Sequence, residues 1–282
     1  MARLRNQGGF SLIEAIVAIV ITGILSSVVA VFIQGPVQGY MDASRRAALT
    51  DIADTAARRI GRDVHLALPN SVRVTQVGAA FYLEFLQTVT GGRYQDIETC
   101  FTTGCTGITT FGDVVPAATI TPGTDRIVIF NQYNNSGADC SAANPSAYCG
   151  NNTSLIGAVV NGGNEDTISF AAQTFVPPGG SPGKRFQVIS GPVTYVCDPT
   201  AGTLRRYSGY AIQPAQPVDN AAAPLSNAPT NALLADSVTG CTFTYDANPA
   251  TVRAGLVSLW LRVSSTGENV DLYYGVHVTN AP

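Results

Sequence analysis

The residues with the clearest chemical potential lie in the first fourteen positions of the chain. Met1–Gly9 is a short polar segment whose only charges are Arg3 and Arg5, and Phe10–Ile33 is apolar except for one acid, Glu14. A carboxylate at bilayer depth costs on the order of 2.5–3.5 kcal/mol on insertion scales, so a buried acid usually has a partner. Glu14 is therefore expected to pair with a positive group.

The segment Gly8–Glu14 (GGFSLIE) resembles the class III signal of type IV pilins and of type II secretion pseudopilins. The resemblance implies that a membrane aspartyl peptidase, the prepilin peptidase, cuts between Gly9 and Phe10 on the cytoplasmic face and methylates the new amine of Phe10. Glycine removes side-chain bulk at that bond, and the released amine, with an ordinary pKa near 8, would be positive.

Glu14 would then be the fifth residue after the cut and could pair with its own amine or that of a neighbouring subunit. Removing one partner of a buried pair costs roughly 3–5 kcal/mol, so such a pair would set the register of assembly. The partners implied are the prepilin peptidase, other pilin subunits through the N-terminal helix, and the inner membrane before assembly.

Two other interpretations of the N-terminal segment remain. A secretory signal peptide would need a shorter apolar region followed by small residues at a cut site, and Val28-Val29-Ala30 is a poor version of one. An uncut signal anchor leaves Glu14 unexplained.

The apolar run also predicts a membrane position. At about 1.5 Å per residue, a helix over 10–33 can cross a bilayer of roughly 30 Å. Arginines on the short side keep that end in the cytoplasm. We expect a single-pass inner-membrane protein with its head in the periplasm, which later reaches a pilus or pseudopilus at the cell surface.

The helix is expected to continue as an amphipathic segment over 34–68. Gly35-Pro36 should kink or interrupt it. Apolar residues then recur at helical spacing, and Asp54–Arg58 and Arg59–Asp63 can pair across one turn. The apolar positions are Leu49, Ile52, Ala56, Ile60 and Val64.

The helix exit carries a second resemblance. RRIGRD at 58–63 and ALPNSVRV at 67–74, with the closing VHVTNAP, resemble large minor pilins of the mannose-sensitive haemagglutinin (MSHA) pilus, the MshO type. They resemble J-type minor pseudopilins of type II secretion more loosely. Pro69 should stop the helix, and Asn70-Ser71 should turn the chain into a strand. Arg59 and Arg62 could instead be solvated surface charges.

Residues 69–282 read as a β-rich head. Short β-branched or aromatic runs predict strands over 71–77, 81–89, 126–133, 167–170, 193–197, 204–210, 238–245, 256–264 and 270–278. Thr266-Gly267-Glu268 reads as a hairpin turn. Loops are expected over 91–122, 131–163 and 177–183, with an extended, exposed Ala/Pro/Asn-rich excursion over 214–229. The fold class is therefore α+β: a long helix packed on a β-rich head.

The six cysteines all lie in the head, and none forms a CxxC pair, which favours disulfides in an oxidising compartment. Two pairs, Cys100–Cys105 and Cys140–Cys149, would close small loops. Cys197 and Cys241 lie in strand-like segments and would pair across the sheet. Six cysteines allow fifteen connectivities, so these pairs are a preference.

No catalytic constellation is evident. His65 and His277 are the only histidines, and the Ser-nucleophile elbow, the Walker A motif and the metalloprotease helix motif are missing. The amide-rich loop 131–139 offers oxygens for Ca²⁺ but lacks EF-hand spacing, so we expect no metal and no cofactor. A formal net charge of −3 and a pI near 5.3 argue against a nucleic-acid partner.

The sequence thus predicts a minor pilin of the MSHA type that acts in pilus assembly, priming or tip formation. The alternatives are a J-type minor pseudopilin of a type II secretion system or a membrane-anchored receptor or enzyme. The expected parts are a leader over 1–9, a membrane and filament-core helix over 10–33, an amphipathic helix over 34–68 and a disulfide-bonded head over 69–282.

Overall fold

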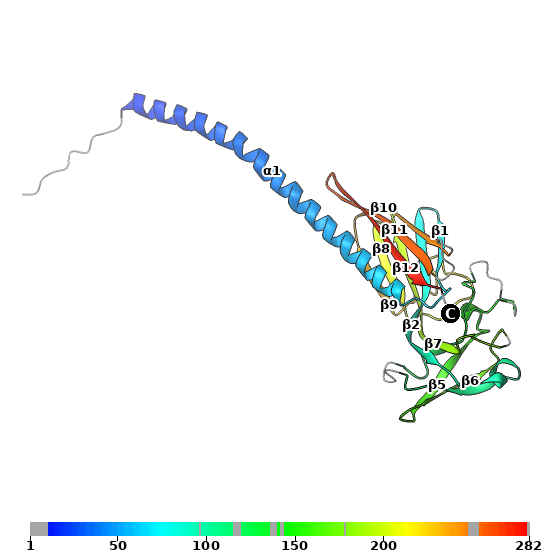
Figure 1. Cartoon of the computed structure of the whole chain (residues 1–282). Coiled ribbons are helices and arrows are strands. Elements are labelled where there is room, and N and C mark those ends of the chain that lie inside the picture. The colour runs from blue at the N-terminus through cyan, green and yellow to red at the C-terminus, as the bar shows by residue number, and fades with distance from the viewer. Residues whose placement is uncertain are drawn as a thin grey trace, which may run out of the picture. The chain divides into compact units, whose positions relative to one another are not determined.

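A computed structural model describes residues 11–95, 97–114, 120–135, 140–141, 144–177, 179–247 and 254–280. The chain divides into two compact units, Met1–Ala48 and Leu49–Pro282. The first unit holds the N-terminal part of one long helix, and the second holds the C-terminal turns of that helix together with every strand (Figure 1).

Helix α1 spans Leu12–His65 and includes Pro36. Of the two outcomes expected at Gly35-Pro36, a kink or an interruption, the interruption is therefore wrong. Pro36 removes a single N–H donor, a local cost of about 3 kcal/mol, and a helix of 54 residues continues on both sides of it. The helix ends at His65, four residues before Pro69. Leu66 and Ala67 form one further turn, and Asn70 then adopts a φ of 56°.

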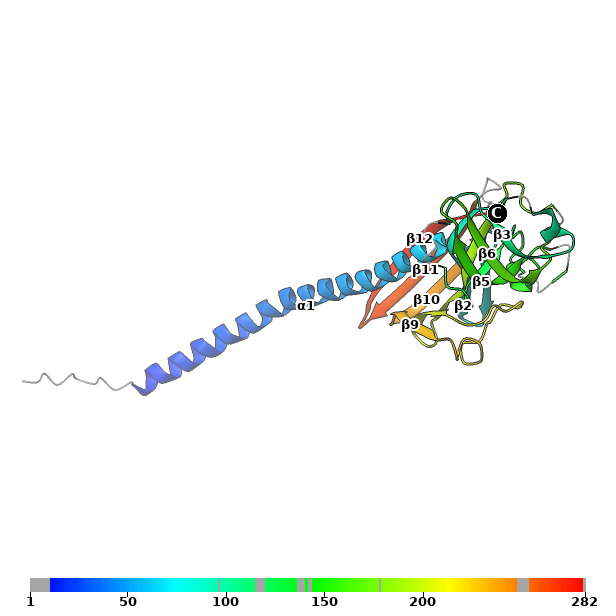
Figure 2. The same cartoon turned by 90° about the horizontal axis from the view of Figure 1, so that it is seen from below.

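The C-terminal turns of α1 belong to the core of the head. Leu49, Ala56, Ile60 and Val64 are buried and Ile52 is partly buried, as the apolar spacing predicts. Arg58 and Arg62 lie on the exposed side. In Figure 2 these turns lie beside the strands of the head, which confirms the long helix on a β-rich head.

Most strands form one nine-stranded sheet within the described residues, with the order β1-β2-β7-β4-β5-β6-β3, and β8 joins β7 to β9. The strands are β1 (Arg73–Val77), β2 (Ala80–Arg93), β3 (Cys105–Thr109), β4 (Arg126–Val128), β5 (Thr153–Asn161), β6 (Asp166–Gln173), β7 (Arg185–Asp198), β8 (Thr203–Ser208) and β9 (Thr230–Ala235). Two 3-10 turns, η1 (Glu98–Phe101) and η3 (Ala147–Cys149), interrupt the loops.

Strands β2 and β7, of 14 residues each, are the longest strands that the structure describes in this sheet. They pair antiparallel from Phe81 opposite Cys197 to Arg93 opposite Arg185. The other edge of β7 is shared, because β4 pairs with it near residue 188 and β8 pairs with it from Val193 onward. Between these two partners lies Gly191, whose φ of 126° suits glycine.

A second sheet has the order β10-β11-β12, from β10 (Val238–Asp246), β11 (Ala254–Ser265) and β12 (Glu268–Thr279). The β11–β12 hairpin turns at Thr266 and Gly267, both with positive φ, as predicted. Val257, Leu259 and Leu261 face a core shared with α1 and with Leu83, Phe85 and Tyr195 of the large sheet. Strands β3, β4, β5 and β6 close over a separate core around Phe170, Phe175 and Phe186.

The sequence misplaces several elements. Strands β3, β5 and β9 lie in segments expected to be loops or left unassigned, because Gly107, Gly157 and Asn231 weaken their strand pattern. The strand expected over 126–133 ends at Val128, and Phe130 has a φ of 58°. The excursion over 214–229 has no strand, but it is not wholly exposed.

Leu225 of that excursion is fully buried against Tyr82, Val196 and Tyr207. A small core therefore lies between the excursion and the large sheet. A single apolar side chain in a polar, proline-rich stretch does not by itself predict a buried contact. The residues that Leu225 packs against follow only from the fold.

Candidate assembly site and the anchoring of its helix

The N-terminus of α1 places Glu14 in the first helical turn. The Glu14 backbone N–H donates to the Ser11 hydroxyl oxygen at 3.3 Å, so Ser11 caps the helix. Ser11 and Glu14 have the spacing of a capping box. The Glu14 side chain is exposed and its carboxylate is in no ion pair among the described residues. Gly9 and Phe10 lie outside the described residues.

The first turns of α1 present apolar side chains on every side. Leu12 is 80% exposed and Phe32 is 77% exposed, and the apolar side chains between them are exposed too. By length and composition the helix can cross a membrane, with a mean hydropathy of 2.8 over its most apolar window. A surface this apolar needs a cover of lipid or of other helices.

Residues 4–30 match the family model of the prokaryotic N-terminal methylation motif, the signal of type IV pilins and pseudopilins. This match supports a type IV pilin-like protein. The motif implies processing by prepilin peptidase and assembly with pilins, and with the apolar helix it suggests membrane anchoring. It favours a structural role over an enzymatic one. No curated protein and no solved structure matches the chain.

The pilin-like helix is held in its head by a buried charge, Asp63. Its Oδ2 accepts a hydrogen bond from Arg206 Nε at 2.6 Å and one from the Tyr195 hydroxyl at 2.7 Å. Its Oδ1 lies 3.5 Å from Arg59 Nε, on the helix surface. The pairs Arg59–Asp63 and Arg58–Asp54, at 2.7 Å, are those expected from helical spacing.

Asp63 thus connects α1 to β7 and β8 of the large sheet. Arg206 also donates to the Ser208 hydroxyl at 2.8 Å. Burial raises the pKa of the Tyr195 phenol well above its ordinary value, and the neighbouring Asp63 carboxylate raises it further. Sequence analysis missed this cluster, although Asp63 lies three residues after Ile60 and so falls on the apolar face.

A second buried pair joins Arg73 of β1 to Glu84 of β2. Both side chains are 0% exposed, and Arg73 Nε lies 2.8 Å from Glu84 Oε2. The Tyr210 hydroxyl donates to Glu84 Oε1 at 2.9 Å, and burial strongly raises the pKa of that phenol. The Arg73 guanidinium lies 3.6 Å from the centre of the Tyr148 ring.

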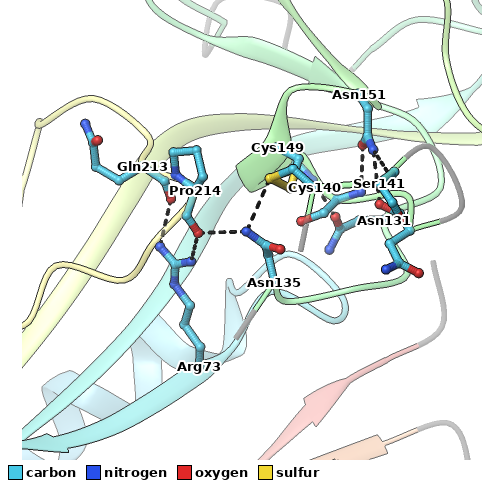
Figure 3. Close-up of a disulfide and its surroundings, with 12 residues drawn as sticks. Arg73, Asn131, Asn135, Cys140, Ser141, Cys149, Asn151, Gln213 and Pro214 are labelled. Carbon is cyan, nitrogen blue, oxygen red and sulfur yellow. Dashed lines mark hydrogen bonds between the residues drawn. A yellow bond between two sulfur atoms is a disulfide. The ribbon is translucent and has the colours of Figure 1, made fainter. Parts of the chain in front are cut away.

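Arg73 also holds the start of the excursion. Its terminal nitrogens donate to the carbonyl oxygens of Pro214 at 2.7 Å and Gln213 at 2.9 Å, as Figure 3 shows. The register of the β1–β2 hairpin, with Val77 opposite Ala80, places Arg73 opposite Glu84. The short turn between the two predicted strands would have allowed this pair to be predicted from the sequence.

The cysteines form the disulfides Cys100–Cys105, Cys140–Cys149 and Cys197–Cys241, the pairs preferred from the sequence. Cys197–Cys241 joins β7 of the large sheet to β10 of the small sheet. Figure 3 shows Cys140–Cys149 beside Asn135, whose amide donates to the Pro214 carbonyl at 2.8 Å.

The two histidines and the amide-rich loop do not lie together in one site among the described residues. His65 is exposed at the end of α1 and His277 is exposed on β12. Among the described residues, no group of three or more His, Cys, Asp or Glu side chains could hold a metal ion. Of the loop 131–139, residues 136–139 lie outside the described residues, and Asn131 uses its side-chain oxygen to accept from the Ala147 N–H.

Proposed function

We propose that this chain is a minor pilin of an MSHA-type type IV pilus. The observation that carries the proposal is the methylation motif at residues 4–30, which begins a helix with an exposed apolar surface. RRIGRD, ALPNSVRV and VHVTNAP support the MSHA type, because they resemble the helix exit and the C-terminus of its large minor pilins. The role proposed is assembly, priming or tip formation.

In this proposal prepilin peptidase cuts between Gly9 and Phe10 and methylates Phe10. The new amine would belong to the residue four positions before Glu14, and the Glu14 carboxylate of a neighbouring subunit could accept a hydrogen bond from it within the apolar helix bundle. Oppositely charged partners that are both shielded from water form a pair whose loss costs roughly 3–5 kcal/mol. That pair would select the depth at which the subunit enters the filament.

Two measurements in the producing bacterium test the proposal. Mass spectrometry of the membrane-extracted protein should give an N-terminus at Phe10 that carries one methyl group. Sheared pili should contain the chain, and deletion of its gene should reduce the number of pili. A mature N-terminus at Met1, or one beyond residue 25, contradicts the pilin interpretation.

The J-type pseudopilin is the second candidate, since the same signal serves both groups and the helix exit resembles both. It predicts a different pair of results. Deletion would leave pili intact and block export of the proteins that the type II system secretes, and the chain would co-purify with pseudopilins.

A further inference from the structure

A cavity of about 570 Å³ lies in the head, beside β4 and β7. Its walls come from the turn before β4, from η3 and its disulfide, from the bend of β7 and from the segment after β8. The volume lies within the range of about 300–1,000 Å³ that is usual for small-ligand sites. Arg126 is its single charged lining residue among those described.

Arg126 is a half-buried cation, and it has no acidic partner among the described residues. Its Nε donates to the Thr153 hydroxyl at 3.4 Å, and no carboxylate in the described part of the chain lies within 4.0 Å of its guanidinium. Burial lowers the pKa of this guanidinium from its ordinary value. The buried cations Arg73 and Arg206, in contrast, each have a carboxylate.

Part of the cavity wall is held in place by hydrogen bonds and by a disulfide. A Cβ added at Gly123 or at Gly150 would have no atom within 4 Å, so the space beside both glycines holds no protein atoms. Pro214 forms another wall, and its carbonyl is held by both Arg73 and Asn135 (Figure 3). Cys149 beside it is held by its disulfide. A preformed wall lowers the entropy cost of binding.

The polar lining also includes two exposed hydroxyls. Thr124 and Ser190 both line the cavity, both are exposed, and neither hydroxyl has a hydrogen-bond partner in the described part of the protein. The cavity therefore offers one guanidinium fork and two free hydroxyl groups beside the apolar surfaces of Ile212 and Pro214.

We propose that this cavity binds an acidic sugar, whose carboxylate accepts two hydrogen bonds from the Arg126 guanidinium while Thr124 and Ser190 contact its hydroxyls. The planar guanidinium matches a carboxylate in a bidentate geometry. A phosphate monoester carries a charge near −2 at neutral pH and attracts several cations, whereas this cavity supplies one. A single negative charge fits it better.

The test uses the purified full-length chain in detergent micelles and ligand-observed NMR titrations. D-glucuronate is the probe, D-glucose is the neutral control, and inorganic phosphate is the third arm. We expect saturable binding of glucuronate at least tenfold tighter than that of glucose or phosphate. Arg126→Gln should weaken glucuronate binding at least tenfold. Arg205→Gln, which removes a guanidinium outside the cavity, should leave binding unchanged.

Ala211→Trp provides a second variant, because Ala211 is an exposed residue of the wall and a large side chain there should block the cavity. Glucuronate bound no better than glucose overturns the proposal. So does unchanged binding by either cavity variant. Phosphate that binds as tightly as glucuronate overturns the sugar assignment. None of these outcomes bears on the N-terminal processing, which is measured separately.

Discussion

At the scale of single residues, two buried carboxylates of the head each lie among matching donors. Asp63 accepts from Arg206 and Tyr195, and Glu84 accepts from Arg73 and Tyr210. Such pairs add little net stability compared with apolar residues of the same shape, but losing one partner leaves an uncompensated charge. Mutations at these positions are therefore expected to act strongly when single and weakly when paired.

The first prediction concerns Asp63 and Arg206. Asp63→Leu or Arg206→Met alone should lower the free energy of unfolding by about 3–5 kcal/mol, because each leaves the other charge buried. The double variant should lose less than the sum of the two. Denaturant unfolding of the full chain in detergent measures these differences.

The exposed pair Asp54 and Arg58 on the same helix provides the matched control. Asp54→Leu and Arg58→Met should each cost less than about 1 kcal/mol, since an exposed ion pair is weak. If the Asp63 and Arg206 variants behaved like this control, the cluster would not anchor the helix.

The second prediction is a loss of stability at alkaline pH. Burial and nearby carboxylates raise the pKa of Tyr195 and Tyr210 above the ordinary 10.0. The folded chain keeps these protons while the unfolded chain loses them, so the free energy of unfolding falls as pH rises above about 10. Unfolding measured between pH 9 and 11 should show this slope.

Tyr195→Phe should flatten that slope, because the residue no longer titrates in either state. Tyr273→Phe, at a phenol that is 78% exposed, should leave it unchanged. Equal slopes in the wild type and in Tyr195→Phe would show that the Tyr195 phenol is not protected by the fold.

The third prediction concerns Glu14. Glu14→Ala should leave export and processing intact but reduce incorporation into the filament, because the helix then offers no carboxylate to a neighbouring amine. Immunoblots of sheared filaments and of membranes compare the two pools. Asp51→Ala, which removes an exposed acid from the same helix, is the control. Normal incorporation of Glu14→Ala would remove the pairing argument.

At the scale of elements, the contact between α1 and β12 depends on one glycine. A Cβ at Gly61 would lie 2.7 Å from the Tyr274 hydroxyl oxygen and 2.8 Å from its ring. The helix can approach the small sheet this closely because residue 61 has no side chain. Glycine within a helix otherwise costs about 1 kcal/mol relative to alanine.

The fourth prediction follows from that contact. Gly61→Ala should lower the free energy of unfolding by about 1–3 kcal/mol, because the methyl group overlaps Tyr274. Tyr274→Ala in the same chain should recover part of that loss. Gly39→Ala, where no atom lies within 4 Å, should be neutral or slightly stabilising. A Gly61→Ala protein as stable as the wild type would contradict the close packing.

The sequence correctly predicted the elements whose spacing of apolar residues can be recognised within one segment of the chain. The helical stripe from Leu49 to Val64 and the alternation of β11 are of this kind. Partners far apart in sequence escaped prediction, since Arg206 lies 143 residues from Asp63 and Tyr195 lies 132 residues from it. Glu14 was found because its motif is local, and cleavage at Gly9 and Phe10 stays a prediction.

At the scale of the whole molecule, Cys197–Cys241 is the covalent link between the two sheets of the head. Its sequence separation is 44, against 5 for Cys100–Cys105. A longer loop in the unfolded chain loses more entropy when it is closed. On the chain-entropy model, the two bonds stabilise by about 4 and about 2 kcal/mol respectively.

The fifth prediction compares these bonds. Replacing both Cys197 and Cys241 by alanine should lower the free energy of unfolding by about 4 kcal/mol, and replacing Cys100 and Cys105 should cost about half as much. Guanidinium unfolding of the oxidised proteins gives both values. The prediction fails if the Cys100 and Cys105 variant is the less stable of the two.

The paired strands β2 and β7 have a mechanical consequence. They pair along their length, and β7 contributes both to the core shared with α1 and to the core around Phe186. Strand β7 is also tied to the small sheet by a disulfide. A pull directed along these strands would slide one past the other, so many hydrogen bonds would have to break together instead of one after another. Tension that enters through the helix would then pass into the part of the head around Phe186 without first peeling the sheet apart.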